Sequence, residues 1–144
     1  MDAKEKANAL VKKYGSRNPF DILDHLNVIV VFYPLKGVRG FYQYFQRNNI
    51  IYIDERLSYR EKMLVCAHEL GHMLLHKKSN ALFMDSRTFF SASKYEKEAN
   101  LFAVELLISD EILSEYRDYT VDQLSRLLGY HKNFIELRLQ SCNR

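Results

Sequence analysis

The stretch CAHELGHMLLH, residues 66–76, contains two histidines whose spacing predicts both a helix and a metal site. His68 and His72 are four residues apart, so on a helix they lie one turn apart on the same face. Their ring nitrogens can then both reach one ion at about 2.0–2.1 Å. Glu69 is placed to accept a proton from a metal-bound water. The H-E-x-x-H pattern therefore indicates a zinc hydrolase with Glu69 as its base.

Two further residues of this stretch, Gly71 and His76, need separate explanations. Glycine costs about 1 kcal/mol relative to alanine inside a helix. We therefore expect Gly71 to serve a close approach of the backbone beside the metal. His76 is separated from His68 by about 12 Å along the helix axis and by about 80° around it. Three rings spread this way do not converge on one ion, so we interpret His76 as a hydrogen-bonding residue near the helix end.

A catalytic zinc site usually has three protein ligands and one open position, so a third ligand must come from another segment. The sequence YEKEAN, residues 95–100, offers Glu96 and Glu98. Glu96 shares a helix face with Asn100, which can orient a ligating histidine through its second ring nitrogen. If Ser93 and Glu96 instead form a capping box, Glu98 would be the ligand. Spacing alone leaves both glutamates open.

The residues before this stretch predict two short helices and a three-stranded sheet. Apolar residues at helical spacing indicate the helices, which precede residue 27. The β-branched run at 27–33 predicts a buried strand. Residues 40–54 predict a hairpin, because two strand-like segments flank Asn48 and Asn49, which we expect in the turn.

The remaining residues predict mainly helices. Ser58 and Glu61 form a capping-box pattern that begins the histidine helix. Residues 79–92 show no clear period and predict a loop. Helical spacing returns in three further segments, the last of which breaks at Gly129: 94–109, 109–116 and 120–140.

The order of these elements indicates an α+β fold with a small three-stranded sheet, an H-E-x-x-H helix and C-terminal helices. A chain of 144 residues is long enough for one domain with its own core. We interpret 1–144 as that domain. Within it we expect helices and sheet at 1–57, the zinc-site helices at 58–109, and C-terminal helices of helix-turn-helix type at 110–144.

The composition, with 47% hydrophobic and 27% charged residues, is ordinary for a soluble protein. A net charge of +3 is too small to imply a nucleic-acid partner by itself. The N-terminal segment alternates charged and apolar residues, which argues against a signal peptide or membrane anchor. The two cysteines are far apart and form no disulfide framework. We therefore expect a cytoplasmic protein.

Nearly the whole chain resembles the ImmA/IrrE metallopeptidases of bacteria and their mobile elements. The resemblance is carried by AHELGHMLLH at 67–76, by EKEANLFAVELLIS at 96–109, and by TVDQLSRLLGYHKNFIELRL at 120–139. The segments NPFDILDHLNVIVVFYPL, GFYQYF and IIYID also resemble the start of the family's domain. The chain departs at Ser109, where members usually have proline, so Ser109 or Asp110 can cap the next helix.

The resemblance implies a zincin-like fold in which His68, His72 and Glu96 bind zinc and Glu69 is the catalytic base. The same ligands also accept Mn²⁺ or Co²⁺. The strand IIYID would lie along the cleft as an edge that can pair with an extended substrate. Characterised members cleave helix-turn-helix repressors, which implies a repressor substrate of this type. Such cleavage would derepress genes of a mobile element, a prophage or a stress response.

Two other functions compete with this interpretation. The tail has the outline of a DNA-binding helix pair, in which Lys132 and Arg138 could meet phosphates. Its second helix carries few side chains that read bases, so we do not expect direct nucleic-acid binding. The other alternative is a regulatory binding module with a structural zinc and little proteolytic activity. The oxyanion donor stays open among three candidates: Tyr52, Tyr116 and His131.

Overall fold

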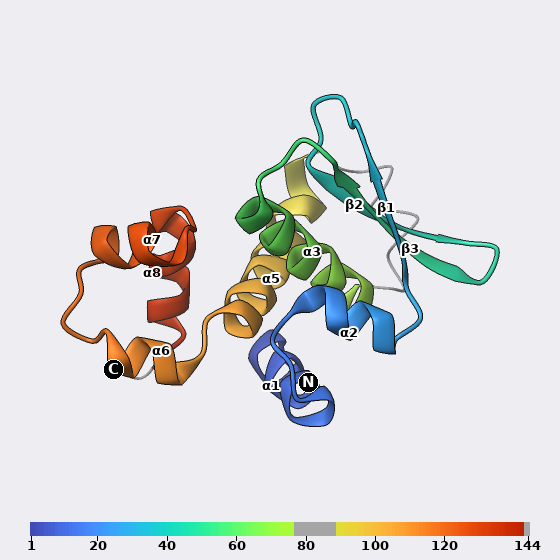
Figure 1. The fold of residues 1–144 in the computed structure, drawn as a ribbon. Helices are drawn as coiled ribbons and strands as arrows, with labels where there is room; N and C mark the ends of the chain where they lie inside the picture. The colour runs from blue at the N-terminus through green and yellow to red at the C-terminus, as the bar shows by residue number, and fades with distance from the viewer. Residues whose placement is uncertain (77–88, 143–144) are drawn as a thin grey trace.

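The computed structural model describes residues 1–76 and 89–142 (Figure 1). Within these ranges three strands form one sheet in the order β1–β3–β2, with β1 parallel and β2 antiparallel to β3. This confirms an α+β fold with a three-stranded sheet. None of the helices in these ranges is long and apolar enough to cross a bilayer. The elements are α1 Ala3–Tyr14, α2 Pro19–His25, β1 Ile29–Tyr33, β2 Gly40–Phe45, β3 Asn48–Asp54, α3 Tyr59–Leu75, α5 Phe89–Leu107, α6 Asp110–Glu115, α7 Val121–Leu128 and α8 Lys132–Gln140.

Helix α3, which carries the histidines, packs against the sheet and also against α5 (Figure 1). It begins with the predicted capping box, in which Ser58 Oγ accepts from the Glu61 amide and Glu61 Oε1 accepts from the Ser58 amide, each at 3.2 Å. Most side chains from Met63 to Met73 are buried. A helix that is covered on several sides needs apolar residues all around its axis, whereas a surface helix needs them along one face only. Contacts with the sheet and with α5 therefore fix the position of α3.

The run at 27–33 forms a strand, but the prediction that this strand is buried was wrong. β1 pairs only with β3 in the described sheet and is therefore an edge strand. Its residues Ile29, Phe32 and Tyr33 are 45%, 46% and 62% exposed. β-Branched and aromatic residues favour extended backbone on an edge as well as in the sheet centre, so their presence does not determine burial.

The hairpin is confirmed, but its turn was predicted two residues too late. The turn residues are Gln46 and Arg47, whose φ angles are 49° and 67°. Positive φ at both central residues is the requirement of a type I′ turn, which asparagine usually satisfies. The observed register instead places two buried side chains opposite each other, Tyr42 and Ile51. Core packing therefore outweighs the local preference of Asn48 for the turn.

The segment IIYID was expected at the edge of the sheet, and this expectation was also wrong. It forms most of β3, which pairs with β1 on one side and β2 on the other. β2 is the edge strand on the side of α3, because Gly40 in β2 packs directly against that helix.

The expected loop at 79–92 lies mostly outside the described residues, and its last residues are helical. α5 begins at Phe89, four residues before Ser93, so Ser93 is inside the helix and does not cap it. The capping-box alternative for Glu96 was therefore wrong. At Gly71 a Cβ would lie 3.0–3.2 Å from the Phe102 side chain of α5. The close approach observed at Gly71 is therefore between α3 and α5.

Gly40 should not tolerate a larger side chain. A Cβ at this position would lie 2.5 Å from Val65 Cγ1 and 2.7 Å from the carbonyl oxygen of Tyr52. The carbonyl belongs to the paired strand, so the clash cannot be relieved without moving the sheet. We expect Gly40→Ala to lower the free energy of unfolding by about 1–3 kcal/mol, as overpacking does in other cores. Urea denaturation measures this change, and an unaltered midpoint and slope would contradict it.

The C-terminal helices begin and end where the sequence predicts. Ser109 caps α6 by accepting from the Ile112 amide at 3.1 Å. Thr120 and Gln123 form a second capping box at the start of α7. Gly129 ends α7 with a φ of 82°, a left-handed conformation that favours glycine.

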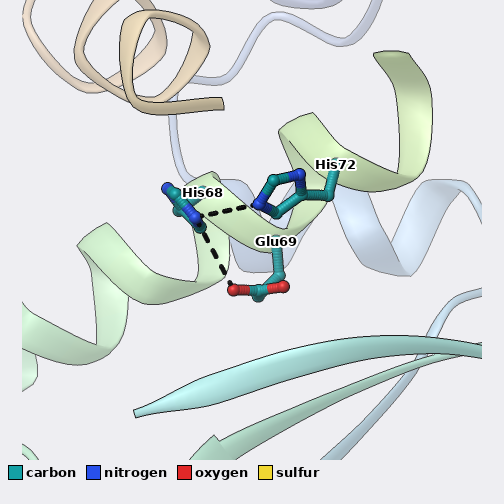
Figure 2. A group of neighbouring side chains, drawn as sticks. All are labelled: His68, Glu69 and His72. Atoms are coloured by element: carbon teal, nitrogen blue, oxygen red, sulfur yellow. Dashed lines mark hydrogen bonds and ion pairs between the residues drawn. The ribbon is translucent and has the colours of Figure 1, made fainter. Parts of the chain in front are cut away.

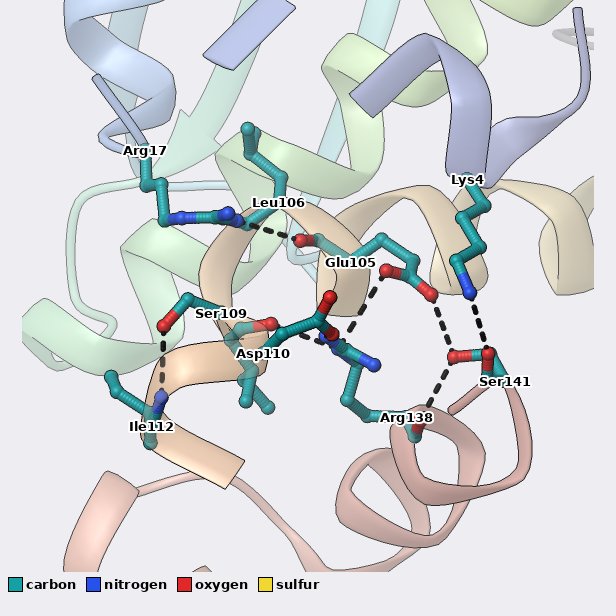
Figure 3. A network of polar contacts seen from close by, with 10 residues as sticks. Lys4, Arg17, Glu105, Leu106, Ser109, Asp110, Ile112, Arg138 and Ser141 are labelled. Carbon is teal, nitrogen blue, oxygen red and sulfur yellow. Dashed lines mark hydrogen bonds and ion pairs between the residues drawn. The ribbon is translucent and has the colours of Figure 1, made fainter. Parts of the chain in front are cut away.

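Arg138 of α8 anchors these helices to the rest of the chain. Its side chain is buried, and its Nε donates to the Ile108 carbonyl at 2.8 Å (Figure 3). Its Nη2 donates to Asp110 Oδ1 at 2.6 Å, and Glu105 Oε2 lies 3.7 Å from Nε. The prediction that Arg138 could meet DNA phosphates was therefore wrong, because its guanidinium group is enclosed by these partners.

Candidate metal centre

The two histidines of the motif point their ring nitrogens at a common point beside α3. His68 Nε2 and His72 Nε2 are 3.0 Å apart (Figure 2). Two ligands of a tetrahedral zinc ion, each about 2.0–2.1 Å from the metal, are about 3.3 Å apart. The arrangement is thus close to the one that a shared ion requires.

Glu96 of α5 faces both rings. Its Oε2 lies 2.9 Å from His68 Nε2, and its Oε1 lies 2.8 Å from His72 Nε2. The other glutamate of the YEKEAN segment, Glu98, instead contacts His76 Nε2 at 3.1 Å. The structure therefore brings Glu96 and not Glu98 to the two motif histidines. The two ring nitrogens lie 3.0 Å apart, and each lies within 2.9 Å of one oxygen of the Glu96 carboxylate, a set of ligand atoms whose chemistry fits zinc.

Each of the two histidines also has a partner at its second ring nitrogen. Asn100 Oδ1 lies 2.7 Å from His68 Nδ1, which is the contact that the sequence predicts for Asn100. His72 Nδ1 lies 3.0 Å from His76 Nδ1. His76 is the C-cap of α3 and is buried, which agrees with a hydrogen-bonding role near the helix end. Such partners fix the orientation of a ligating ring.

Burial and the neighbouring charges set the protonation of this group. Burial lowers the pKa of His72 to about 4, so this ring is neutral at pH 7. Burial would also lower the pKa of His68, but its contacts with Glu96, Glu69 and Asn100 outweigh this effect and raise its pKa. Burial acts to raise the pKa of Glu96, yet its hydrogen bonds to both rings hold that pKa well below the usual range. Glu96 is therefore ionised at neutral pH.

These pKa shifts predict how zinc affinity depends on pH. A metal binds the neutral imidazole, so a proton on His68 must leave before zinc binds. His72 stays neutral down to about pH 4, and Glu96 stays ionised. Because the pKa of His68 is raised, affinity should decrease as the pH falls through that pKa, by about ten-fold per pH unit below it. Chelator competition between pH 8 and pH 5.5 measures this slope. A ten-fold change in zinc affinity for every half pH unit, or no change with pH, would contradict the loss of a single proton from His68.

Glu69 lies on the same turn of α3 as His68. Its carboxylate is buried, and its Oε2 is 3.9 Å from His68 Nε2, on the side of the helix that faces the sheet (Figure 2). Ligand-type atoms of His68, Glu69 and His72 all lie within 4.8 Å of one another. The Glu69 carboxylate is thus close to the two histidine rings, but its distance to His68 Nε2 is longer than that of the Glu96 carboxylate.

A cavity of about 660 Å³ gives access to this group. His68, Glu69, Glu96 and Asn100 form its polar wall. The rest of the lining comes from residues 37–40 before and in β2, which include Arg39, from Leu64 and Val65 of α3, and from Phe134 of the distant helix α8.

No sequence pattern singled out these other cavity residues, and the three candidates for the oxyanion donor lie outside the cavity. Tyr52 donates to Gln43 Oε1 at 2.9 Å on the sheet. His131 and Tyr116 are cap residues of α8 and α6. None of the three lines the cavity within the described residues. A glycine at the start of a predicted strand could have pointed to Gly40 as a position of close packing beside the cavity. Nothing in the sequence around Phe134 indicates that this residue reaches the cavity.

Comparison with known proteins assigns the chain to a family. The family description "IrrE N-terminal-like domain" matches residues 23–140. "Uncharacterized immunity region protein 2" of Bacillus phage phi105 is 40% identical over 138 residues, covering 94% of this chain and 87% of that protein. "Metallopeptidase ImmA" of Bacillus subtilis (strain 168) is 31% identical over 118 residues, covering 81% of this chain and 69% of that protein.

A solved structure adds information on the fold. A Mycobacterium tuberculosis transcriptional regulator superposes with a TM-score of 0.68 at 14% sequence identity. The superposition covers 99% of this chain and 48% of the regulator, so this chain spans about half of that protein's length. At this identity the similarity concerns the fold alone. The domain match and the similarity to ImmA show that this chain belongs to the ImmA/IrrE family of metallopeptidases.

Proposed function

We propose that this protein is a zinc-dependent endopeptidase of zincin-like fold, with His68, His72 and Glu96 as the metal ligands. The observation that carries the proposal is that the two Nε2 atoms lie 3.0 Å apart and that each has an oxygen of the Glu96 carboxylate within 2.9 Å. His68 and Glu96 line a cavity that Glu69 also lines. Three protein ligands leave one position for water and substrate, which is the pattern of catalytic rather than structural zinc.

The residues around the cavity have distinct roles in this proposal. Bound zinc would polarise the scissile carbonyl and make a bound water more acidic. Glu69 accepts the proton of the attacking water and then transfers it to the leaving nitrogen. Asn100 holds the ring of His68 in place through its contact with Nδ1. Phe134 and Leu64 give the cavity an apolar wall against which a substrate side chain packs.

The proposed substrate is a helix-turn-helix repressor whose cleavage derepresses genes of a mobile element, a prophage or a stress response. The name of the phage relative, an immunity region protein, supports a prophage setting. Zinc is the proposed metal, and Mn²⁺ or Co²⁺ are alternatives with the same ligands. The buried position of Arg138 argues against the DNA-binding alternative.

Incubation with a candidate repressor tests this function. The natural choice is a small helix-turn-helix protein encoded beside this chain's gene. We expect the zinc-loaded protein to make one defined cut, which mass spectrometry locates, and expect a chelator to prevent it. A peptide library serves as a second substrate. If the zinc-loaded protein cleaves neither, the chain is a binding module with a structural metal, and the proposal fails.

A further inference from the structure

The third histidine of the opening stretch connects the proposed metal site to a carboxylate that is not a ligand. We propose that His76 and Glu98 form a hydrogen-bond relay that sets the proton position and the orientation of the His72 ring. Both are positioning residues, because they act on the metal only through His72. The inference rests on the proposed metal site and assigns a role to two residues outside it.

The contacts of this relay are continuous. His72 Nδ1 lies 3.0 Å from His76 Nδ1, and His76 Nε2 lies 3.1 Å from Glu98 Oε2. The residues His72 and His76 are 2% and 5% exposed, so water does not replace these contacts easily. Tyr95 of α5 packs on the His76 ring with centroids 4.4 Å apart. The ring is therefore held from two positions on α5.

The order of donors and acceptors along the relay follows from the metal end. A neutral His72 that gives its Nε2 lone pair to a metal carries its proton on Nδ1. That proton is donated to His76 Nδ1, which must then be unprotonated. A neutral His76 consequently carries its proton on Nε2 and donates it to the carboxylate of Glu98. Only this arrangement makes every contact in the relay a hydrogen bond with both rings neutral.

Helix α5 thus supports the two motif histidines in different ways. Asn100 accepts directly from His68, whereas Glu98 accepts from His76, and His76 accepts from His72. A carboxylate behind a ligating histidine makes that histidine a stronger ligand, and losing such support typically costs 10–100-fold in metal affinity. The relay therefore gives Glu98, which is two residues from Glu96, an effect on the metal without direct contact.

A purely structural role for His76 would satisfy the same buried nitrogens, so the test must measure more than folding. We would compare zinc dissociation constants of the wild type, His76→Leu, His76→Asn and Glu98→Ala by chelator competition. The relay predicts a 10–100-fold weaker affinity for His76→Leu and Glu98→Ala. It also predicts partial recovery in His76→Asn, whose side-chain oxygen can accept near the position of Nδ1. Lys97→Ala, an exposed change on α5, is the matched control and should match the wild type.

Nitrogen NMR of the zinc-loaded wild type tests the proton positions directly. Long-range ¹H–¹⁵N spectra should show His76 protonated on Nε2 and His72 protonated on Nδ1. A His76 ring protonated on Nδ1, or folded His76→Leu and Glu98→Ala variants that bind zinc as tightly as the wild type, would overturn the relay. If His76→Leu does not fold, the Glu98→Ala affinity and the wild-type spectrum decide. A wild type that binds no zinc would instead refute the proposed metal site itself.

Discussion

Glu69→Gln should slow peptide hydrolysis by orders of magnitude and leave zinc bound. The amide has the size of the carboxylate, so the packing of this buried side chain is preserved. It cannot accept a proton from the attacking water, and loss of a general base typically lowers the rate by about 10²–10⁴-fold. Glu69 Oε2 lies 3.9 Å from His68 Nε2, farther than the contacts among the three proposed ligands. The zinc affinity should therefore change little. A cleavage assay with the repressor, paired with a zinc titration, measures both quantities.

The matched control for this variant is Glu61→Gln, on the same helix. Glutamine can keep the capping box with Ser58, so the helix start is preserved. Glu61 does not line the cavity, and Glu61→Gln should cleave at the wild-type rate. A Glu69→Gln protein with full activity would remove Glu69 from the mechanism. Loss of zinc from that variant would make Glu69 a ligand instead of a base.

Glu96→Ala should reduce zinc affinity far more than Glu98→Ala. Glu96 approaches both motif histidines at 2.8–2.9 Å, whereas Glu98 contacts only His76. Removal of Glu98 should cost the 10–100-fold that is typical of a residue behind a ligand. Removal of Glu96 takes away a ligand itself, so the loss should exceed about 100-fold. The dissociation constants of the two variants, measured by chelator competition, give the comparison.

The two glutamates make this comparison stringent. They lie on the same helix, and their side chains are similarly exposed, at 41% and 40%. Differences in helix propensity therefore cancel between the two alanine variants. Circular dichroism of both metal-free proteins would establish that α5 is retained. A larger loss for Glu98→Ala than for Glu96→Ala would reverse the assignment of the third ligand.

The local features of the site were predictable because they depend on residues close in sequence. The four-residue spacing of His68 and His72 places both rings on one face of any helix. The capping residues around Ser58 ensure that this segment is helical, and both capping hydrogen bonds are present. The same reasoning predicted the helix ends at Ser109 and Gly129, which are confirmed.

Sequence patterns were less informative wherever the outcome depended on pairing or packing between distant segments. The turn of the hairpin lies at Gln46 and Arg47, because the register is determined by which side chains β2 and β3 bury. Gly71 contacts Phe102, more than thirty residues away, and its purpose cannot be read from its own helix.

The sequence by itself thus determined the two motif histidines, the adjacent glutamate and the helix that carries them, since a helix repeats with a fixed local period. The tertiary structure alone determined which glutamate faces those rings. Glu96 and Glu98 are two residues apart on α5, and the choice between them depends on how α5 packs on α3. The same packing places His76 against Glu98 and, through α8, brings Phe134 to the cavity. Contacts of this kind arise between segments whose relative position no local periodicity encodes.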